Sequence, residues 1–175
     1  MSRPRCSVFI AASLDGFIAR ADGAIDWLSM VERPGEDYGI REFYASVDAI
    51  MMGRKTYESA LGFGAWPYAG MRCVVLTSKP HGSSRHGEEF ASGELEAIVQ
   101  RLGAEGVRRL YVDGGVVIGQ LLAAKLVDDV TVSIIPVLLG EGTPLSPRIG
   151  RDVALELTSH RAFESGLVQL VYRVR

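Results

Sequence analysis

The chain has 175 residues, a hydrophobic content of 47% and a formal net charge of -2. This length is too short for two ordinary domains, so we expect a single domain over residues 1–175. The charge predicts no basic face for nucleic acid, and no apolar stretch approaches the ~20 residues of a membrane-spanning helix. Without a His/Cys cluster at metal-ligand spacing, and with Cys6 and Cys73 in apolar runs, we expect no metal and a cytoplasmic protein.

Residues 6–12 form a nearly continuous apolar run, which is typical of a strand covered on both faces. The small residues at 11–13 would let a flat ring lie close to the backbone, or would pack under a helix; both interpretations stay open. A loop over residues 21–24 leads to Trp27, whose ring could face either the core or a cleft.

The segment 32–39 is polar and contains Pro34 and Gly35. We predict that a helix starts in this segment and runs to Ser46, with a buried stripe that includes Phe43. Asp37 is one of the carboxylates of this helix. Most such carboxylates are simply solvated, so the position alone gives Asp37 no catalytic role.

The stretch 47–59 carries the first strong signal for a ligand. An apolar strand over residues 49–52 stops at Gly53 and is followed by a helix, so backbone N–H groups and the positive end of the helix dipole are free for a phosphate. Arg54 and Lys55 add charge, and the Thr56 hydroxyl can bind a phosphate oxygen or cap the helix. An ordinary turn with solvated cations is the alternative.

A strand over residues 71–77 ends in two hydroxyls and a cation, Thr77, Ser78 and Lys79. Ligands of open α/β sheets bind at the carboxyl ends of the strands, although a solvated turn is equally consistent with this segment. A glycine-rich loop with an aromatic residue precedes the strand, over residues 61–70. Residues 80–91 are polar and predict a further loop.

A second strand–glycine–helix unit follows later in the chain. We predict a helix capped by Ser92 and ending at Leu102, then a strand over residues 107–112 that stops at Asp113. Gly114 and Gly115 let a pyrophosphate approach the backbone closely, and a helix over residues 116–125 comes next. Two such units and a hydroxyl-bearing strand end together predict a dinucleotide site along one sheet edge.

The remaining chain predicts strands. Residues 128–139 are β-branched, with Pro136 indicating an edge or a bulge, and residues 140–144 read as a loop. Residues 153–161 and 167–175 alternate apolar and polar side chains around Gly166, which indicates an antiparallel hairpin. The fold class is therefore α/β, with a mainly parallel central sheet flanked by helices and an antiparallel hairpin at the C-terminus. This apolar hairpin and edge strand favour a homodimer.

The order of these motifs resembles the dihydrofolate reductase superfamily over nearly the whole chain. The phrases that carry the likeness are residues 11–19 (AASLDGFIA), 52–59 (MGRKTYES), 76–78 (LTS) and 113–115 (DGG). Together with residues 135–140 (IPVLLG), they are more similar to the riboflavin-pathway branch. That branch contains the reductase domain of the bifunctional deaminase-reductase and stand-alone bacterial reductases. The resemblance implies a dihydrofolate reductase-like fold and NADPH as cofactor.

The resemblance also implies roles for individual residues. The positions that match contacts to the cofactor NADPH are Ala11, Ile18, Gly53, Arg54, Lys55, Thr56, Thr77, Ser78, Lys79, Gly114, Gly115 and Val116. Trp27 matches an aromatic residue near the mouth of the substrate site, and Ser133 matches a hydroxyl near the substrate. Val116 stands where a cation often binds the 2′-phosphate, so a preference for NADPH rests mainly on Arg54. Asp37 lies near the carboxylate that handles the pterin proton.

These features predict an NADPH-dependent reductase that transfers a hydride to a C=N or C=O carbon of a small heterocyclic substrate. Asp37 is the candidate proton donor, Ser133 a lesser one, and ordered water a third. One alternative is a reductase of the ribosylaminopyrimidine phosphate of riboflavin synthesis. The serine- and arginine-containing phrase expected of such an enzyme is not obvious between Leu28 and Asp37. Another alternative is a non-catalytic module that binds or senses NADPH.

Overall fold

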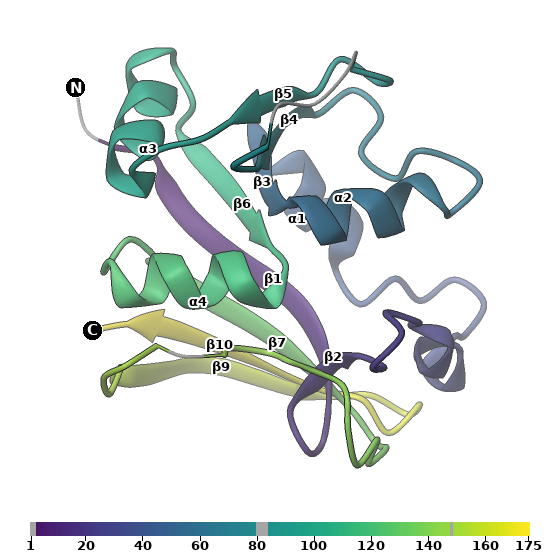
Figure 1. The fold of residues 1–175 in the computed structure, drawn as a ribbon. Coiled ribbons are helices and arrows are strands. Elements are labelled where there is room, and N and C mark those ends of the chain that lie inside the picture. Colours follow the sequence, from purple (N-terminus) through teal and green to yellow (C-terminus); the bar gives the residue numbers. More distant parts are fainter. Residues whose placement is uncertain (1–2, 80–83, 148) are drawn as a thin grey trace.

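The computed structural model describes residues 3–79, 84–147 and 149–175 (Figure 1). The order of the elements along the chain alternates strands and helices before the terminal hairpin. They are β1 (Arg5–Ser13), β2 (Phe17–Ala19), the 3-10 helix η1 (Asp26–Val31), α1 (Ile40–Ala45), β3 (Ala49–Gly53), α2 (Arg54–Leu61), β4 (Arg72–Leu76), β5 (Glu89–Ala91), α3 (Leu95–Ala104), β6 (Arg109–Asp113), α4 (Gly115–Ala123), β7 (Asp129–Ile135), β8 (Thr143–Pro144), β9 (Leu155–Ala162) and β10 (Val168–Val174).

The main sheet has eight strands in the order β5-β4-β3-β6-β1-β7-β10-β9. The strands from β5 to β7 pair in parallel, whereas β10 is antiparallel to both β7 and β9. A separate two-stranded sheet joins β2 to β8. The predicted fold class, a mainly parallel sheet with an antiparallel C-terminal hairpin, is confirmed.

The core lies on both faces of the sheet, as the continuous apolar strands predict. Met51 packs with residues of α3 and α4 in one cluster, and its neighbour Met52 packs with α1 and α2 in another. Successive strand residues point to opposite faces, so a strand buried on both faces must be apolar throughout. Figure 1 shows α3 and α4 in front of the sheet and α1 behind it. Cys6 and Cys73 are buried free thiols, as predicted, and burial raises the pKa of each to about 12.

The predicted helix over segment 32–46 is much shorter in the structure. Only Ile40–Ala45 is helical, and Tyr38 and Gly39 before it have φ angles of 54° and 83°. A left-handed residue cannot continue a right-handed helix, so the chain approaches α1 through turns. Asp37 therefore lies in a turn before the helix.

Other predicted boundaries also shift. The N-cap of α3 is Glu94, with no side-chain capping bond, so the predicted cap at Ser92 is wrong. Two segments predicted as loops contain short strands, β5 within residues 80–91 and β8 within residues 140–144; residues 80–83 lie outside the described part. Strand β7 ends at Ile135, directly before Pro136, which lacks the N–H that a further ladder bond needs.

The outermost strand, β9, carries exposed apolar side chains. Leu155 and Leu157 are 46% and 50% exposed, so the edge strand on which a homodimer is predicted presents two apolar side chains to solvent. Within the described residues, no helix combines the length and apolarity that crossing a membrane requires.

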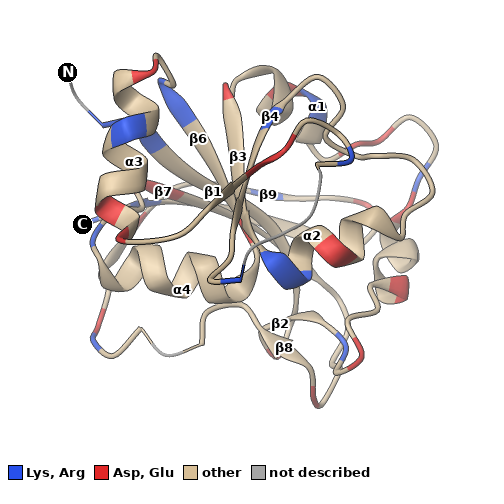
Figure 2. Cartoon of the chain, turned by 45° about the horizontal axis from the view of Figure 1, so that its top comes forward, with Lys and Arg blue, Asp and Glu red and all other residues tan. Residues whose placement is uncertain are grey.

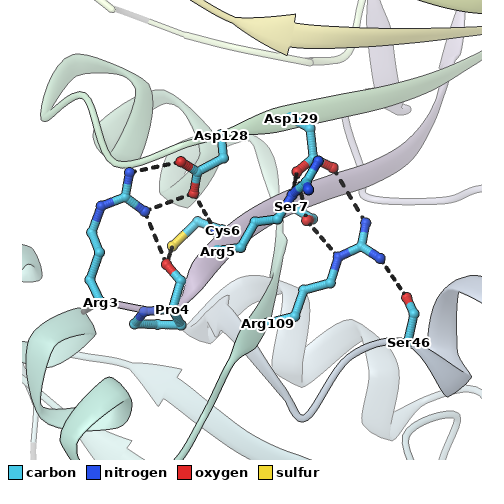
Figure 3. A network of polar contacts seen from close by, with 9 residues as sticks. All are labelled: Arg3, Pro4, Arg5, Cys6, Ser7, Ser46, Arg109, Asp128 and Asp129. Carbon is cyan, nitrogen blue, oxygen red and sulfur yellow. Dashed lines mark hydrogen bonds and ion pairs between the residues drawn. The ribbon is translucent and has the colours of Figure 1, made fainter. Parts of the chain in front are cut away.

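A polar network ties β1, β6 and β7 together at their amino ends (Figure 3). The Asp128 carboxylate accepts hydrogen bonds from the Arg3 guanidinium and from the Cys6 N–H. Asp129 is 5% exposed and is held by Arg5 and Arg109, with N···O distances of 2.6 and 3.4 Å. A buried carboxylate needs such partners. The network holds the three strands in register and occupies their amino ends. A ligand of this sheet is therefore expected at the opposite edge, at the carboxyl ends of the strands.

A second buried carboxylate, Glu88, holds the chain segment before β5 against α2. It is 4% exposed and accepts hydrogen bonds from the Tyr57 hydroxyl and from the N–H groups of Arg85 and His86, the last two at 2.8 and 2.7 Å. Burial opposes ionisation, but these hydrogen bonds outweigh it and lower the pKa of Glu88 to about 2.

We expect Glu88→Gln to destabilise the protein at neutral pH by about 1–3 kcal/mol, because a buried charge-assisted network loses its acceptor. Since the folded-state pKa is depressed, this stabilisation is present above about pH 4.5 and is lost as the pH falls toward about 2. Urea denaturation of both proteins across this range measures the difference. Glu164→Gln, at an exposed position, is the control; a difference that does not shrink in acid would contradict the assignment.

Candidate functional site

A cavity of about 1860 Å³ opens at the carboxyl ends of the parallel strands. Most of the residues predicted for the site from the sequence line it. They are Ala11, Ile18, Asp37, Gly53, Arg54, Lys55, Thr56, Thr77, Ser78, Gly114, Gly115, Val116 and Ser133. The structure thus brings together residues from the first 20 positions and from position 133 around one space.

Trp27 and Lys79 are the two predicted site residues that do not line this cavity. Trp27 is 2% exposed and packs in the core with Val31, Ile135 and Leu167. Its indole N–H has no hydrogen-bond partner among the described residues. Lys79 is exposed, and its N–H instead donates to Thr77 Oγ1 at 3.2 Å.

Two helices begin side by side at this cavity. Strands β3 and β6 are parallel neighbours, so α2 and α4, which follow them directly, both start at the same sheet edge. Neither N-terminus has a side-chain cap among the described residues. A Cβ atom on Gly114, where φ is 89°, would lie 2.4 Å from Thr56 Oγ1, so the two turns are in contact. The N–H groups of both first turns can therefore bind one anionic group.

Arg54 and Lys55 place two cations at this junction, which Figure 2 shows in blue at the start of α2, beside α4. The Arg54 Nε atom is 2.6 Å from Glu58 Oε1, and the two side chains are 42% and 48% exposed. A solvent-exposed ion pair of this kind contributes only ~0–1 kcal/mol. Arg54 can therefore leave Glu58 for a phosphate at little cost.

The other face of the α4 N-terminus is covered by the chain segment 143–147. A Cβ atom on Gly115 would lie 2.5 Å from the Pro144 carbonyl oxygen, and one on Gly119 would lie 2.7 Å from that of Pro147. Only glycine permits this approach of two backbones. The sequence reading used Gly115 for its turn and missed Gly119; the four-residue spacing of the two glycines was the available signal.

Ala11, predicted beside the nicotinamide, and Ser133, predicted near the substrate, lie on adjoining strands. Ala11 on β1 is paired with Ser133 on β7, and both line the cavity. Ser133 is 5% exposed, and its Oγ accepts a hydrogen bond from Gln169 Nε2 at 3.1 Å. At the end of β4, Thr77 is anchored by its N–H to the Ala91 carbonyl at 2.9 Å.

A carboxyl group, that of Asp113 at the end of β6, also lines the cavity. Its carboxylate accepts hydrogen bonds from the Gly114 N–H at 2.8 Å and the Tyr68 hydroxyl at 3.1 Å. Burial dominates and raises the pKa of Asp113. Tyr44 and Tyr111 also line the cavity nearby, and burial raises the pKa of Tyr44 to about 12. The site therefore contains a carboxyl group whose pKa is raised by burial, close to three tyrosine hydroxyls.

The sequence pattern marks Asp113 only as part of the glycine turn and does not indicate its burial or its contact with Tyr68. Asp37, the proton donor that it favoured, lines the cavity on a more exposed wall. The Asp37 side chain is 34% exposed, accepts a hydrogen bond from the Gly39 N–H at 3.0 Å and has Arg41 Nε at 3.5 Å. Asp37 thus has an i,i+4 ion-pair partner that Asp113 lacks among the described residues.

The chain is similar to several known proteins. It is 34% identical over 167 residues to the uncharacterized protein YwjB of Bacillus subtilis (strain 168), with 94% of this chain and 95% of YwjB covered. The crystal structure of a candidate riboflavin biosynthesis protein from Shewanella sp. PV-4 matches with a TM-score of 0.92 and 32% identity, over 98% of this chain and 99% of that one.

The dihydrofolate reductase of Enterococcus faecalis, crystallised with NADP(H), shares the fold at a TM-score of 0.66 and 20% identity, over 98% of this chain and 96% of that one. The predicted dihydrofolate reductase-like fold is therefore confirmed. The model of one protein family, the RibD C-terminal domain, matches residues 4–169. Since this match spans nearly all of the sequence, the chain belongs to the RibD C-terminal domain family.

Proposed function

We propose that the protein is an NADPH-dependent reductase that transfers a hydride to a C=N or C=O carbon of a small, pterin- or ribosylaminopyrimidine-like heterocycle. The observation that carries this proposal is the pair of uncapped helix N-termini, α2 and α4, that meet beside Arg54 at one cavity. The family membership and the fold shared with an NADP(H)-bound reductase support it.

The residues of the cavity fit such a cofactor. The N–H groups that follow Gly53 and Gly114 suit a diphosphate, because they are donors without a side-chain cap in the described structure. Arg54 would hold the 2′-phosphate, and Ala11 and Ile18 would flank the nicotinamide. When bound, the cofactor supplies the hydride; the chain orients it and excludes water.

Reduction also needs a proton for the nitrogen or oxygen that gains electrons. Asp113 is the group of this chain best suited to hold that proton, because burial raises the pKa of its carboxyl and the residue lines the cavity. The Tyr68 hydroxyl, 3.1 Å from Asp113, keeps the carboxyl in place. Asp37 and Ser133 remain the competing candidates.

Arg54→Ala is expected to raise the Kd for NADPH by about 10–100-fold, the range set by one lost charge-assisted hydrogen-bonding group. The Kd for NADH should change by less than about threefold, because NADH lacks the 2′-phosphate that Arg54 would contact. Isothermal titration calorimetry of the wild type and the variant with both nucleotides measures this difference.

Arg108→Ala is the matched control, since its guanidinium is 88% exposed and pairs with Asp48 at the amino end of the sheet. This variant should bind both nucleotides as the wild type does. Equal weakening of NADPH and NADH by Arg54→Ala would refute the assigned role, and no binding of either nucleotide to the wild type would refute the proposal itself.

The second candidate is 5-amino-6-(5-phosphoribosylamino)uracil reductase, favoured by the family match and the Shewanella relative. Loss of NADPH absorbance on addition of that compound would identify it. A non-catalytic NADPH-binding module is the remaining alternative. It would bind the nucleotide and show no turnover with any pterin, pyrimidine or quinone.

A further inference from the structure

Two walls of the cavity carry different sets of charged residues. At the start of α2 the lining side chains include the cations Arg54 and Lys55 and the carboxylate of Glu58, which pairs with Arg54. The chain segment before α1, residues 32–37, lines another wall with three carboxylates, Glu32, Glu36 and Asp37. If α2 holds the phosphates of the cofactor, this acidic wall faces the space that is left for the substrate.

One cation, Arg33, lies within the acidic wall. Its guanidinium donates to the main-chain carbonyls of Glu32 at 2.7 Å and Met30 at 3.4 Å, so it is used to hold its own segment. Glu36 accepts a hydrogen bond from the Tyr38 N–H at 2.8 Å. With Arg41 Nε 3.5 Å from Asp37 Oδ2, three carboxylates stand against two cations here, and the remaining negative charge is unfavourable for an added anion.

Aromatic side chains also line the cavity. Phe9, Tyr44, Tyr68 and Tyr111 line the cavity, and the Tyr44 ring centroid lies 6.0 Å from that of Tyr111 and 6.3 Å from that of Tyr68. Flat rings give a large contact surface to another planar ring. The Asp113 carboxyl and the Tyr68 hydroxyl add a polar pair that can bind a ring nitrogen or carbonyl.

We propose that this part of the cavity takes a planar heterocycle that is uncharged or cationic and carries no phosphate. The inference rests on the proposed function, because it assumes that the α2 and α4 N-termini are occupied by the cofactor. The proposed substrate differs in this respect from the phosphorylated ribosylaminopyrimidine, which would bring a phosphate of its own toward the acidic wall. The preferred substrate class is therefore a free heterocycle or its unphosphorylated glycoside.

The test compares two compounds that differ by one phosphate, 5-amino-6-(5-phosphoribosylamino)uracil and its dephosphorylated form. The Kd of each is measured by calorimetry with the protein saturated with NADP+, which supports no reduction, and kcat/KM is measured with NADPH. We expect the dephosphorylated compound to bind at least as tightly, and by up to about tenfold more tightly at low salt.

Reversal of one charge on the acidic wall sharpens the test. Glu36→Lys, at an exposed position, should shift the ratio of the two Kd values by about tenfold toward the phosphorylated compound. Glu96→Lys makes the same change in net charge on α3, outside the cavity lining, and should leave the ratio unchanged. The wild-type comparison decides the question even if Glu36→Lys fails to fold.

Tighter binding of the phosphorylated compound, above all if Arg33→Ala abolishes it, would overturn the inference, and so would binding of neither compound. Titration of the protein with NADPH alone tests the proposed function separately. If the protein binds NADPH normally but binds the phosphorylated compound more tightly, the proposed substrate class is rejected and the reductase proposal stands.

Discussion

Asp113→Asn is expected to lower kcat by about 100-fold or more, the usual effect of removing a general acid. The Kd for NADPH should stay within about threefold, because the amide keeps the shape of the carboxyl and its oxygen can still accept the Gly114 N–H. Steady-state kinetics with any substrate that is turned over, together with calorimetry for NADPH, separates the two effects.

The dependence of activity on pH also tests Asp113 as the proton donor, because the direction of the change is fixed. Because the pKa of Asp113 is raised, the carboxyl stays protonated to a higher pH than an ordinary aspartate, and wild-type activity should fall as the pH rises through that value. Asp113→Asn should lose this limb of the profile. A variant that keeps the same limb and the same kcat would show that another group supplies the proton.

Asp37→Asn is the decisive comparison, since Asp37 is the donor favoured by the sequence. Its carboxylate is 34% exposed and paired with Arg41, so we expect a loss of less than about tenfold in kcat. A large loss of kcat in Asp37→Asn, with none in Asp113→Asn, would identify Asp37 as the proton donor.

The expected loss of kcat in Asp113→Asn cannot be explained by a loss of stability. A carboxyl with a raised folded-state pKa adds stability that is present at low pH and is lost as the pH rises through that pKa. Above that pKa the native aspartate no longer contributes this stability, and the asparagine variant should melt there at the same or a higher temperature. Thermal denaturation of the wild type and the variant across pH checks this sign.

The parts of the site that the sequence predicted are local in the chain. Gly53 and the two cations after it follow an apolar strand directly, so one short phrase contains the strand, the turn and the helix start. The same holds for Asp113 and the glycines behind it. In a parallel sheet these strand ends meet at one edge, and their convergence follows from the pattern alone.

The parts that were missed depend on contacts between distant segments. Tyr44, Tyr68 and Asp113 come from a helix, a loop and a strand end, and no spacing in the sequence links them. The start of α1 was misplaced because Tyr38 is left-handed, and its side chain contacts a distant segment, with its hydroxyl 2.9 Å from Ser165 Oγ. Strands β5 and β8 are short, so whether these segments form strands depends on their pairing with β4 and β2 and not on their composition.

The close approach at Gly115 gives the other large expected effect. Its added Cβ atom would lie 2.5 Å from the Pro144 carbonyl oxygen and 3.3 Å from Ile18 Cδ1, so Gly115→Ala must displace the segment that covers α4. That segment pairs with β2, which contains Ile18, and the shift therefore reaches the cavity wall that we propose lies beside the nicotinamide. A displacement of about 1 Å can cost 100-fold in a positioned reaction.

We expect Gly115→Ala to raise the Kd for NADPH by at least about tenfold and to lower kcat by roughly 100-fold. The change in stability should be modest, because overpacking costs ~1–3 kcal/mol while alanine in place of helical glycine returns ~1 kcal/mol. Calorimetry with NADPH and thermal denaturation measure the two quantities on the same preparation.

Gly119→Ala is the matched control, one helical turn farther along α4. Its Cβ atom would lie 2.7 Å from the Pro147 carbonyl oxygen, a similar clash, yet Gly119 does not line the cavity. If both variants lose similar stability, but only Gly119→Ala keeps the wild-type Kd for NADPH, then the effect of Gly115→Ala arises at the cavity wall that contacts the cofactor. If both variants bind NADPH like the wild type, the segment over α4 does not shape the site; if both fail equally, the clash acts through the fold as a whole.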